Sequence, residues 1–177
     1  MTIGDAKRKV YKLLDEYGAG DAVDEDLEEK MNDFFDIAQK DVAKISKIVR
    51  TIELSGEGRH AMPKDFVAVH RIWKGGKNVT RHSTWRAGTL VLEKNETVEL
   101  DYFATPQTIT DETGDEWEFE VAEDACEAMP FYVAGMVLSS DLVQDGQIYF
   151  ELYERAKLNI RGTLPGGGRR IVNSFYG

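Results

Sequence analysis

Three histidines are the residues of this chain best suited to bind a metal ion. They are His60, His70 and His82, and all three lie in or beside a stretch rich in β-forming residues. Their spacing matches neither an HxH nor an HExxH pattern, so local structure does not bring two imidazoles onto one ion. The acidic group at residues 21 and 24–26 lacks the turn glycine and closing glutamate of a calcium loop. It suits a helix N-terminus better, and the sequence predicts no metal site.

The sequence gives equally little support for a nucleophilic residue or a phosphate-binding site. Cys126 is the only cysteine and lies in the most apolar stretch, which predicts a buried hydrophobic residue and leaves no partner for an internal disulfide. Three glycines at residues 166–168 precede Arg169 and Arg170, but no strand precedes them, no helix follows, and the phosphate-loop lysine and hydroxyl are missing. We interpret them as a hinge. The sequence predicts no catalytic or cofactor-binding residue and a protein that is not an enzyme.

Aromatic residues of the β-rich stretch offer one binding alternative. Trp73, Trp85 and Trp117, with Tyr102 and Phe103, could line a face on which sugars or bases stack, although such residues more often fill the core of a small β domain. The chain of 177 residues has a net charge of -10, which disfavours broad binding to nucleic acid. No signal peptide and no membrane-spanning apolar run is recognised, so we expect a soluble protein of the cytoplasm or of a particle assembled there.

The strongest helical pattern occupies residues 121–159. In its first half the apolar residues recur three and four apart, and Phe131, Tyr132 and Met136 add apolar surface on the opposite side. This helix is therefore predicted to be buried nearly all round, with those three side chains contacting the β region or a neighbouring subunit. Pro130 is expected either to kink the helix or to be its first residue.

A short turn over residues 141–146 leads to a second helix with one apolar stripe, so the two helices are predicted to pack antiparallel. Two more helices are predicted near the N-terminus. The first follows a capping arrangement of Thr2 and Asp5, and the second extends from residue 24 to residue 48.

Between these helical pairs the hydrophobic period becomes alternating. Strand candidates separated by turns fall at residues 50–54, 66–73, 84–86, 89–93, 97–103 and 116–121. The last has the cleanest alternation, with Trp117, Phe119 and Val121 predicted to face inward and glutamates outward.

The predicted fold is α+β: a helical bundle with an inserted antiparallel β sandwich or half-barrel and an extended C-terminal arm. Its parts are an N-terminal helical pair at 1–48, a β domain at 49–121, a C-terminal helical pair at 122–160 and the arm at 161–177. The arm has no periodicity, yet it ends in large apolar groups. We expect it to dock on a partner, by strand addition or by placing aromatic side chains in pockets.

Several segments resemble head-tail connector proteins of tailed bacteriophages. They are VYKLLDEYG at residues 10–18, DEDLEEKMNDFFDIAQKDVAKISKI at 24–48, TITDETGDEWEFEV at 108–121, EAMPFYVAGMVL at 127–138 and QIYFELYERA at 147–156. The resemblance covers most of the chain in order, but it rests on diffuse patterns and includes no invariant catalytic signature. The β span departs from the smallest connectors, which are almost wholly helical.

What the resemblance implies is a virion structural protein of the neck, between capsid and tail, assembled in the host cytoplasm. It would form a ring, commonly a dodecamer in such proteins, beneath the portal protein and above a downstream neck or tail protein, with DNA passing through the lumen without specific binding. The arm would dock on the portal or a neighbouring subunit through these residues: Arg161, Leu164, Arg169, Arg170, Ile171, Val172, Phe175 and Tyr176. The alternatives are another phage neck or tail-completion protein and, from a different class, a carbohydrate-binding β module.

Overall fold

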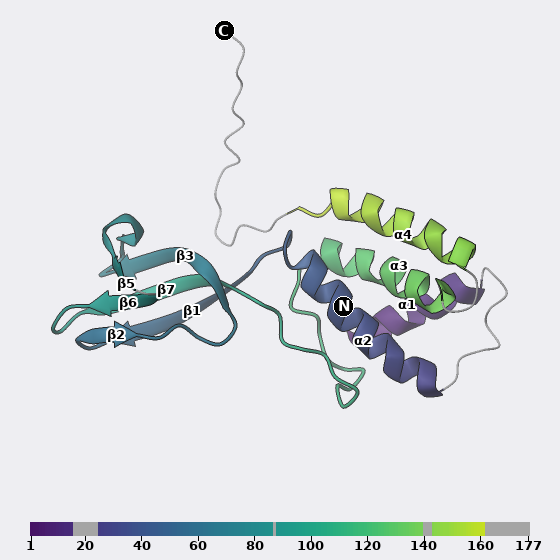
Figure 1. Cartoon of the computed structure of the whole chain (residues 1–177), viewed down its shortest axis with the longest axis horizontal. Helices are drawn as coiled ribbons and strands as arrows, with labels where there is room; N and C mark the ends of the chain where they lie inside the picture. The colour runs from purple at the N-terminus through teal and green to yellow at the C-terminus, as the bar shows by residue number, and fades with distance from the viewer. Residues whose placement is uncertain (16–24, 87, 140–142, 162–177) are drawn as a thin grey trace, which may run out of the picture.

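The computed structural model describes residues 1–15, 25–86, 88–139 and 143–161, and among them it shows a helical body and a β domain at opposite ends of the molecule (Figure 1). The helices of the body are α1 (Ile3–Asp15), α2 (Glu25–Val42), α3 (Glu123–Ser139) and α4 (Val143–Leu158). The β domain lies between α2 and α3 in the sequence. The predicted α+β fold, with a β domain inserted between two helical pairs, is confirmed.

Helix α1 begins where the sequence predicts a cap. The Asp5 N–H donates to Thr2 Oγ1 at 3.1 Å, and the Thr2 N–H donates to Asp5 Oδ2 at 3.2 Å. This reciprocal pair satisfies two backbone donors at a helix start that would otherwise have no partner. It therefore fixes the first turn of α1, whose apolar stripe then packs on α3.

Helix α3 is the centre of the helical body. Nine of its residues are buried, from Ala125 to Leu138, against apolar faces of α1, α2 and α4. Pro130 lies inside the helix, so the prediction that it begins the helix is wrong. Its ring is itself buried in the core, and packing there opposes the cost of the hydrogen bond that a proline cannot donate.

The crossing of α3 and α4 depends on two glycines. A Cβ on Gly146 would lie 2.2 Å from Ser139 Oγ and 2.8 Å from the Gly135 carbonyl, and a Cβ on Gly135 would lie 2.9 Å from the Phe150 ring. Only residues without a side chain allow the two helices to approach this closely. The prediction that Gly146 belongs to the turn between the helices is wrong, because Gly146 lies near the start of α4.

The β domain consists of two antiparallel sheets. The strands are β1 (Ile48–Ser55), β2 (Gly58–His60), β3 (Phe66–Lys74), β4 (Lys77–Asn78), β5 (Thr84–Arg86), β6 (Thr89–Leu92) and β7 (Thr97–Ala104), with a 3-10 turn at Thr80–His82. The larger sheet has the order β1-β7-β3-β4 and the smaller one β2-β6-β5. Their facing sides share a core made by Ile72, Leu90, Leu92, Val98, Leu100, Tyr102 and Ala104.

The predicted last strand, residues 116–121, is not part of either sheet. Only an isolated bridge between Thr2 and Glu118 occurs there, and Phe119 packs against Phe35 of α2 with the ring centroids 5.6 Å apart. The alternation was correctly interpreted, since Phe119 and Val121 are buried and the glutamates are exposed, but the inward side meets the helical body. The β domain therefore ends at Ala104, not at residue 121.

Helix α2 ends at Val42, six residues before its predicted end. A turn follows, and β1 begins at Ile48. Two segments thus join the helical body to the β domain, residues 43–47 and residues 105–122 (Figure 1). Buried Gln39 holds the second against α2: its Nε2 donates to the Gln107 carbonyl at 3.2 Å, and its Oε1 accepts from the Glu120 N–H at 3.1 Å.

Candidate interaction groove between helix α2 and the β domain

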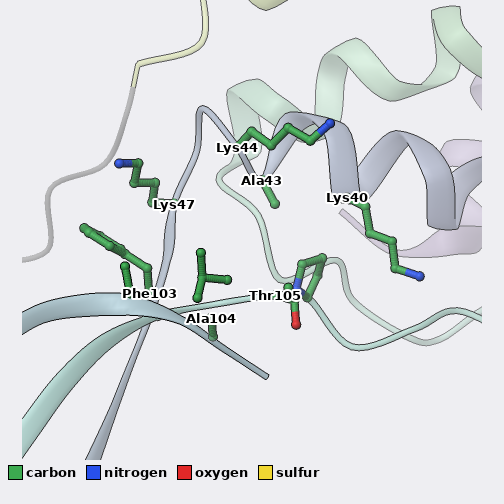
Figure 2. Close-up of a pocket in the computed structure, with 10 residues that line it drawn as sticks. Lys40, Ala43, Lys44, Lys47, Phe103, Ala104 and Thr105 are labelled. Carbon is green, nitrogen blue, oxygen red and sulfur yellow. The ribbon is translucent and has the colours of Figure 1, made fainter. Parts of the chain in front are cut away.

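A groove of about 290 Å³ opens where the C-terminal end of α2 meets the sheet. Three lysines line one side of it: Lys40 in the last turn of α2, Lys44 in the turn that follows the helix, and Lys47 directly before β1. The opposite wall and floor are mostly apolar and come from the ends of β3 and β7 and the segment after them. These residues are Val67, Ala68, Phe103, Ala104, Thr105 and Pro106. Figure 2 shows Lys47 next to Phe103, with Lys40 extending from α2 and Lys44 from the turn after it.

The three lysines differ in how far their charge is neutralised. Lys40 Nζ lies 2.6 Å from Asp36 Oδ2, and Lys44 Nζ lies 3.1 Å from Asp41 Oδ1. Lys47 instead lies over Phe103, with its ammonium 4.6 Å from the ring centroid, and within the described ranges no carboxylate pairs with it. A cation on an aromatic face gains a modest attraction and keeps most of its charge available. Lys47 is therefore the groove cation best able to meet an incoming carboxylate.

Asp41 fixes the lysine-bearing end of α2 to α4. Its Oδ2 accepts from Lys157 Nζ and from Tyr153 Oη, each at 2.8 Å, while its Oδ1 accepts from Lys44. Burial alone would raise the pKa of Asp41, but the hydrogen bonds from Lys157, Tyr153 and Lys44 outweigh it and lower the pKa to about 2. Asp41, which is partly covered from solvent, thus attaches the lysine side of the groove to α4 and so to the helical body.

The outer face of the sheet continues from the groove floor. The His70 ring lies 4.8 Å from the Phe103 ring, and its Nε2 is buried without a hydrogen-bond partner. Burial and the neighbouring charge of Arg71 lower the pKa of His70. Next to it, Asp101 accepts hydrogen bonds from Thr51 Oγ1 at 2.7 Å and Trp73 Nε1 at 2.8 Å. These contacts hold the face rigid beside the groove.

The structure keeps the three histidines apart. His60 Nε2 contacts the Gly56 carbonyl at 3.0 Å, His70 stacks on Phe103, and His82 is exposed in the 3-10 turn. Among the residues that the structure describes, no three His, Cys, Asp or Glu side chains are grouped so as to hold a metal ion. Cys126 is buried, as predicted, and burial raises the pKa of its thiol to about 11.

The three tryptophans likewise have separate surroundings. Trp73 bonds to Asp101 on the outer face of the larger sheet, Trp85 packs on the core between the sheets, and Trp117 packs edge-on against Phe119 in the helical body. All three are half-buried. They form no common stacking platform, so the feature that suggested a carbohydrate-binding module is not assembled in this fold.

The predicted interface residues of α3 are partly covered by α4. The Tyr132 ring lies 5.2 Å from Tyr153 and 5.9 Å from Phe150, and Met136 is half-buried. Phe131 is also half-buried and lines a second hollow of about 540 Å³, bounded by α1, α3 and α4. Tyr132 therefore contributes to the helical body itself, while part of Phe131 faces an open surface.

One predicted arm residue is within the described chain. Arg161 is exposed, and its backbone N–H donates to Asp124 Oδ2 at 2.7 Å, which ties the end of the chain's described part to the start of α3. The other predicted docking residues lie outside the described residues: Leu164, Arg169, Arg170, Ile171, Val172, Phe175 and Tyr176. The first residue of the predicted arm is therefore fixed to the helical body.

Sequence reasoning missed the groove. The signal on the helical side was present in the spacing of Lys40, Lys44 and Lys47, but nothing local indicated that Phe103 and Val67 would lie opposite them. None of the described helices combines the length and apolar character needed to cross a bilayer. In comparisons with known proteins, no protein-family model matches the sequence and no curated protein matches it.

Proposed function

We propose that this protein is a structural, non-catalytic component of a phage neck, a head-tail connector that bridges the capsid portal and the tail. The observation that carries the proposal is the series of sequence segments that resemble such connectors, spread in order over most of the chain. The fold offers compatible parts: a helical body and an inserted β domain, with Arg161, the first residue of the predicted arm, bonded to the start of α3.

In this proposal twelve copies form a ring beneath the portal, and the arm of residues 161–177 docks on the portal or a neighbouring copy. The opposite side of the ring receives a downstream neck or tail protein, and DNA passes through the lumen. The net charge of -10 supports a lumen that repels phosphate and does not retain the DNA. Such a protein is located in the virion neck.

The test is to combine the purified protein with the portal protein of the same phage and to determine the stoichiometry by native mass spectrometry and electron microscopy. We expect a ring bound to the portal. A chain lacking residues 162–177 should retain its folded core, because the core residues of the described helical body extend from Ile3 to Ile160, but should fail to bind. The matched control replaces Lys77, an exposed lysine of β4, with Glu and should bind normally. A full-length chain that ignores the portal would refute the proposal.

A second candidate is another neck or tail-completion protein that binds further from the capsid. The same arm could serve either position, because apolar groups beside Arg169 and Arg170 suit any complementary pocket. Cross-linking from the arm separates the two cases: links to the portal support the connector, and links to tail-tube proteins support the alternative.

A further inference from the structure

An acidic turn lies beside helix α2, away from the C-terminal end that leads to the groove lysines. Residues 110–116 carry four exposed carboxylates: Asp111, Glu112, Asp115 and Glu116. Asn32 Nδ2 of α2 donates to the Thr110 carbonyl at 3.1 Å, which places this acidic turn beside the N-terminal half of α2. In Figure 1 the loop extends from the helical body away from α4.

The acidic turn is held in one shape before any partner arrives. The Thr113 N–H donates to the Thr110 carbonyl at 2.9 Å, and the Thr110 N–H donates to Thr113 Oγ1 at 2.9 Å. Asp115 also pairs with Lys7 of α1 at 3.1 Å. A turn that is already ordered loses little conformational entropy on binding, so its remaining carboxylates are well suited to recognition.

The acidic turn and the groove of one chain are held apart. Asn32 lies eight residues before Lys40, the first residue of the groove wall, so about 12 Å of helix separates the base of the acidic turn from the start of that wall. Helix α2 thus has the carboxylates of the acidic turn beside its N-terminal half, and the groove lysines at and just after its C-terminal end. Opposite charges at two different places on the same chain favour a head-to-tail contact between copies, which is the kind of contact that closes rings.

We infer that the groove of one copy receives the acidic turn of the next copy. In this contact the carboxylates of Asp111 and Glu112 approach Lys44 and Lys47, while the methylene and methyl groups of Glu112 and Thr113 cover the apolar floor. The inference rests on the proposed ring and identifies the surfaces that would join its subunits. The chain's own arm is a poorer occupant, because Arg169 and Arg170 have the same charge as the lysines.

The test uses two charge-reversed proteins. The groove variant carries Lys44→Glu and Lys47→Glu, and the turn variant carries Asp111→Lys and Glu112→Lys. Each alone brings like charges together at every contact, so its self-association should weaken at least about tenfold relative to wild type. In an equimolar mixture each groove meets a turn of opposite charge. We expect association to return, in assemblies that contain the two variants in equal number.

Native mass spectrometry gives the composition of these assemblies, and sedimentation velocity gives their affinity. The wild-type association should also weaken with rising salt. Charge-matched controls place the changes at the far tips of the β domain, as Lys77→Glu with Lys94→Glu, and as Glu57→Lys with Glu93→Lys. Their association should equal that of wild type. Circular dichroism and thermal unfolding confirm that all variants are folded.

A mixture that does not associate, or a wild-type chain that is monomeric at every concentration, overturns the inference. If only the groove variant loses association, another acidic segment occupies the groove, and the acidic turn is refuted as its occupant. If deletion of residues 162–177 abolishes association while both charge variants keep it, the arm joins the copies instead. Binding of the portal is measured in parallel: variants that bind the portal without complementing each other refute this contact and leave the connector proposal standing.

Discussion

Replacing Asp41 with Asn should remove a pH-dependent part of the protein's stability. Asp41 accepts hydrogen bonds from Lys157, Tyr153 and Lys44, and its pKa falls from an ordinary 3.8 to about 2 in the folded protein. At about 1.36 kcal/mol for each pKa unit, the difference corresponds to roughly 2.4 kcal/mol. The Asp41 side chain is 32% exposed, and solvent screening reduces the expected contribution to about 1–2 kcal/mol.

The sign follows from the direction of the shift. Because the folded pKa is below the unfolded pKa, the ionised carboxylate stabilises the folded state at pH values above about 4. This stabilisation is lost as the pH falls from about 4 to about 2. The free-energy difference between wild type and Asp41→Asn should therefore be largest near neutral pH and should narrow markedly by pH 2.

The assay is urea-induced unfolding followed by circular dichroism at pH values from 7 to 2, with both proteins measured at the same ionic strength. Asp33→Asn is the matched control, because Asp33 is exposed on the same helix and has no ion pair among the described residues. It should differ from wild type by less than about 0.5 kcal/mol. If the curves of wild type and Asp41→Asn run parallel across the whole pH range, the hydrogen bonds do not select the ionised carboxylate and the reasoning is refuted.

Three further predictions test the packing, the core thiol and the junction of the two parts. Gly146→Ala should destabilise the fold by about 1–3 kcal/mol in urea unfolding, because its Cβ would overlap α3, whereas Gly114→Ala, with open space around it, should not. Cys126 should react with a thiol reagent at pH 8 only on unfolding, and fast labelling of the folded protein would contradict its burial. Arg50→Lys keeps the charge but cannot bridge Asp65 and Glu120 together, so unfolding should become easier by about 1 kcal/mol and limited proteolysis between the two parts faster.

The strands up to Ala104 could be predicted because their signals are local. Alternating residues such as Val98, Leu100 and Tyr102 face one core, and two-residue turns separate the strands. At the turn between β3 and β4, Gly75 and Gly76 both have positive φ, 54° and 74°, a conformation that glycine adopts without steric cost. Short turns of this kind pair β3 with β4 and β5 with β6, which are neighbours in the sequence. The pairings of β1 and β3 with β7 and of β2 with β6 join strands that are distant in the sequence, and the chain order does not predict them.

Residues 116–121 show where the local signal stops being sufficient. The alternation there correctly predicts which side chains point inward, because any extended segment with one buried face produces it. It does not reveal that Phe119 on the buried face packs against Phe35 of α2. Nor does it reveal that the backbone of this segment bonds to the N-terminus, where Met1 pairs with Phe119 and Ile3 with Trp117. Sequence separation of more than one hundred residues hides this pairing from any local pattern.

Gly146 was misplaced for a related reason. A glycine between two helical patterns predicts a turn when only conformational preference is considered. In the fold the same residue allows α4 to approach Ser139 and Gly135 of α3, a requirement that arises only when the two helices meet. Conformational freedom and absence of a side chain are two properties of glycine, and the sequence does not distinguish which one is used.

The two walls of the groove are positioned in different ways, one mainly by local structure at the end of α2 and the other by long-range strand pairing. Lys40 is placed by its position in the last turn of α2, and Lys44 by the turn that follows and by its ion pair with Asp41, which joins that helix to α4. Phe103 is placed by the register of β7, and the distance between the two walls depends on residues 43–47 and 105–122. Arg50 of β1 bonds Glu120 in the second of these segments at 2.5 Å, so an ion pair outside the groove helps to set its width. A contact between copies at this groove would therefore be sensitive to Arg50→Lys, although Arg50 does not line the groove, whereas a contact made only by the arm would not.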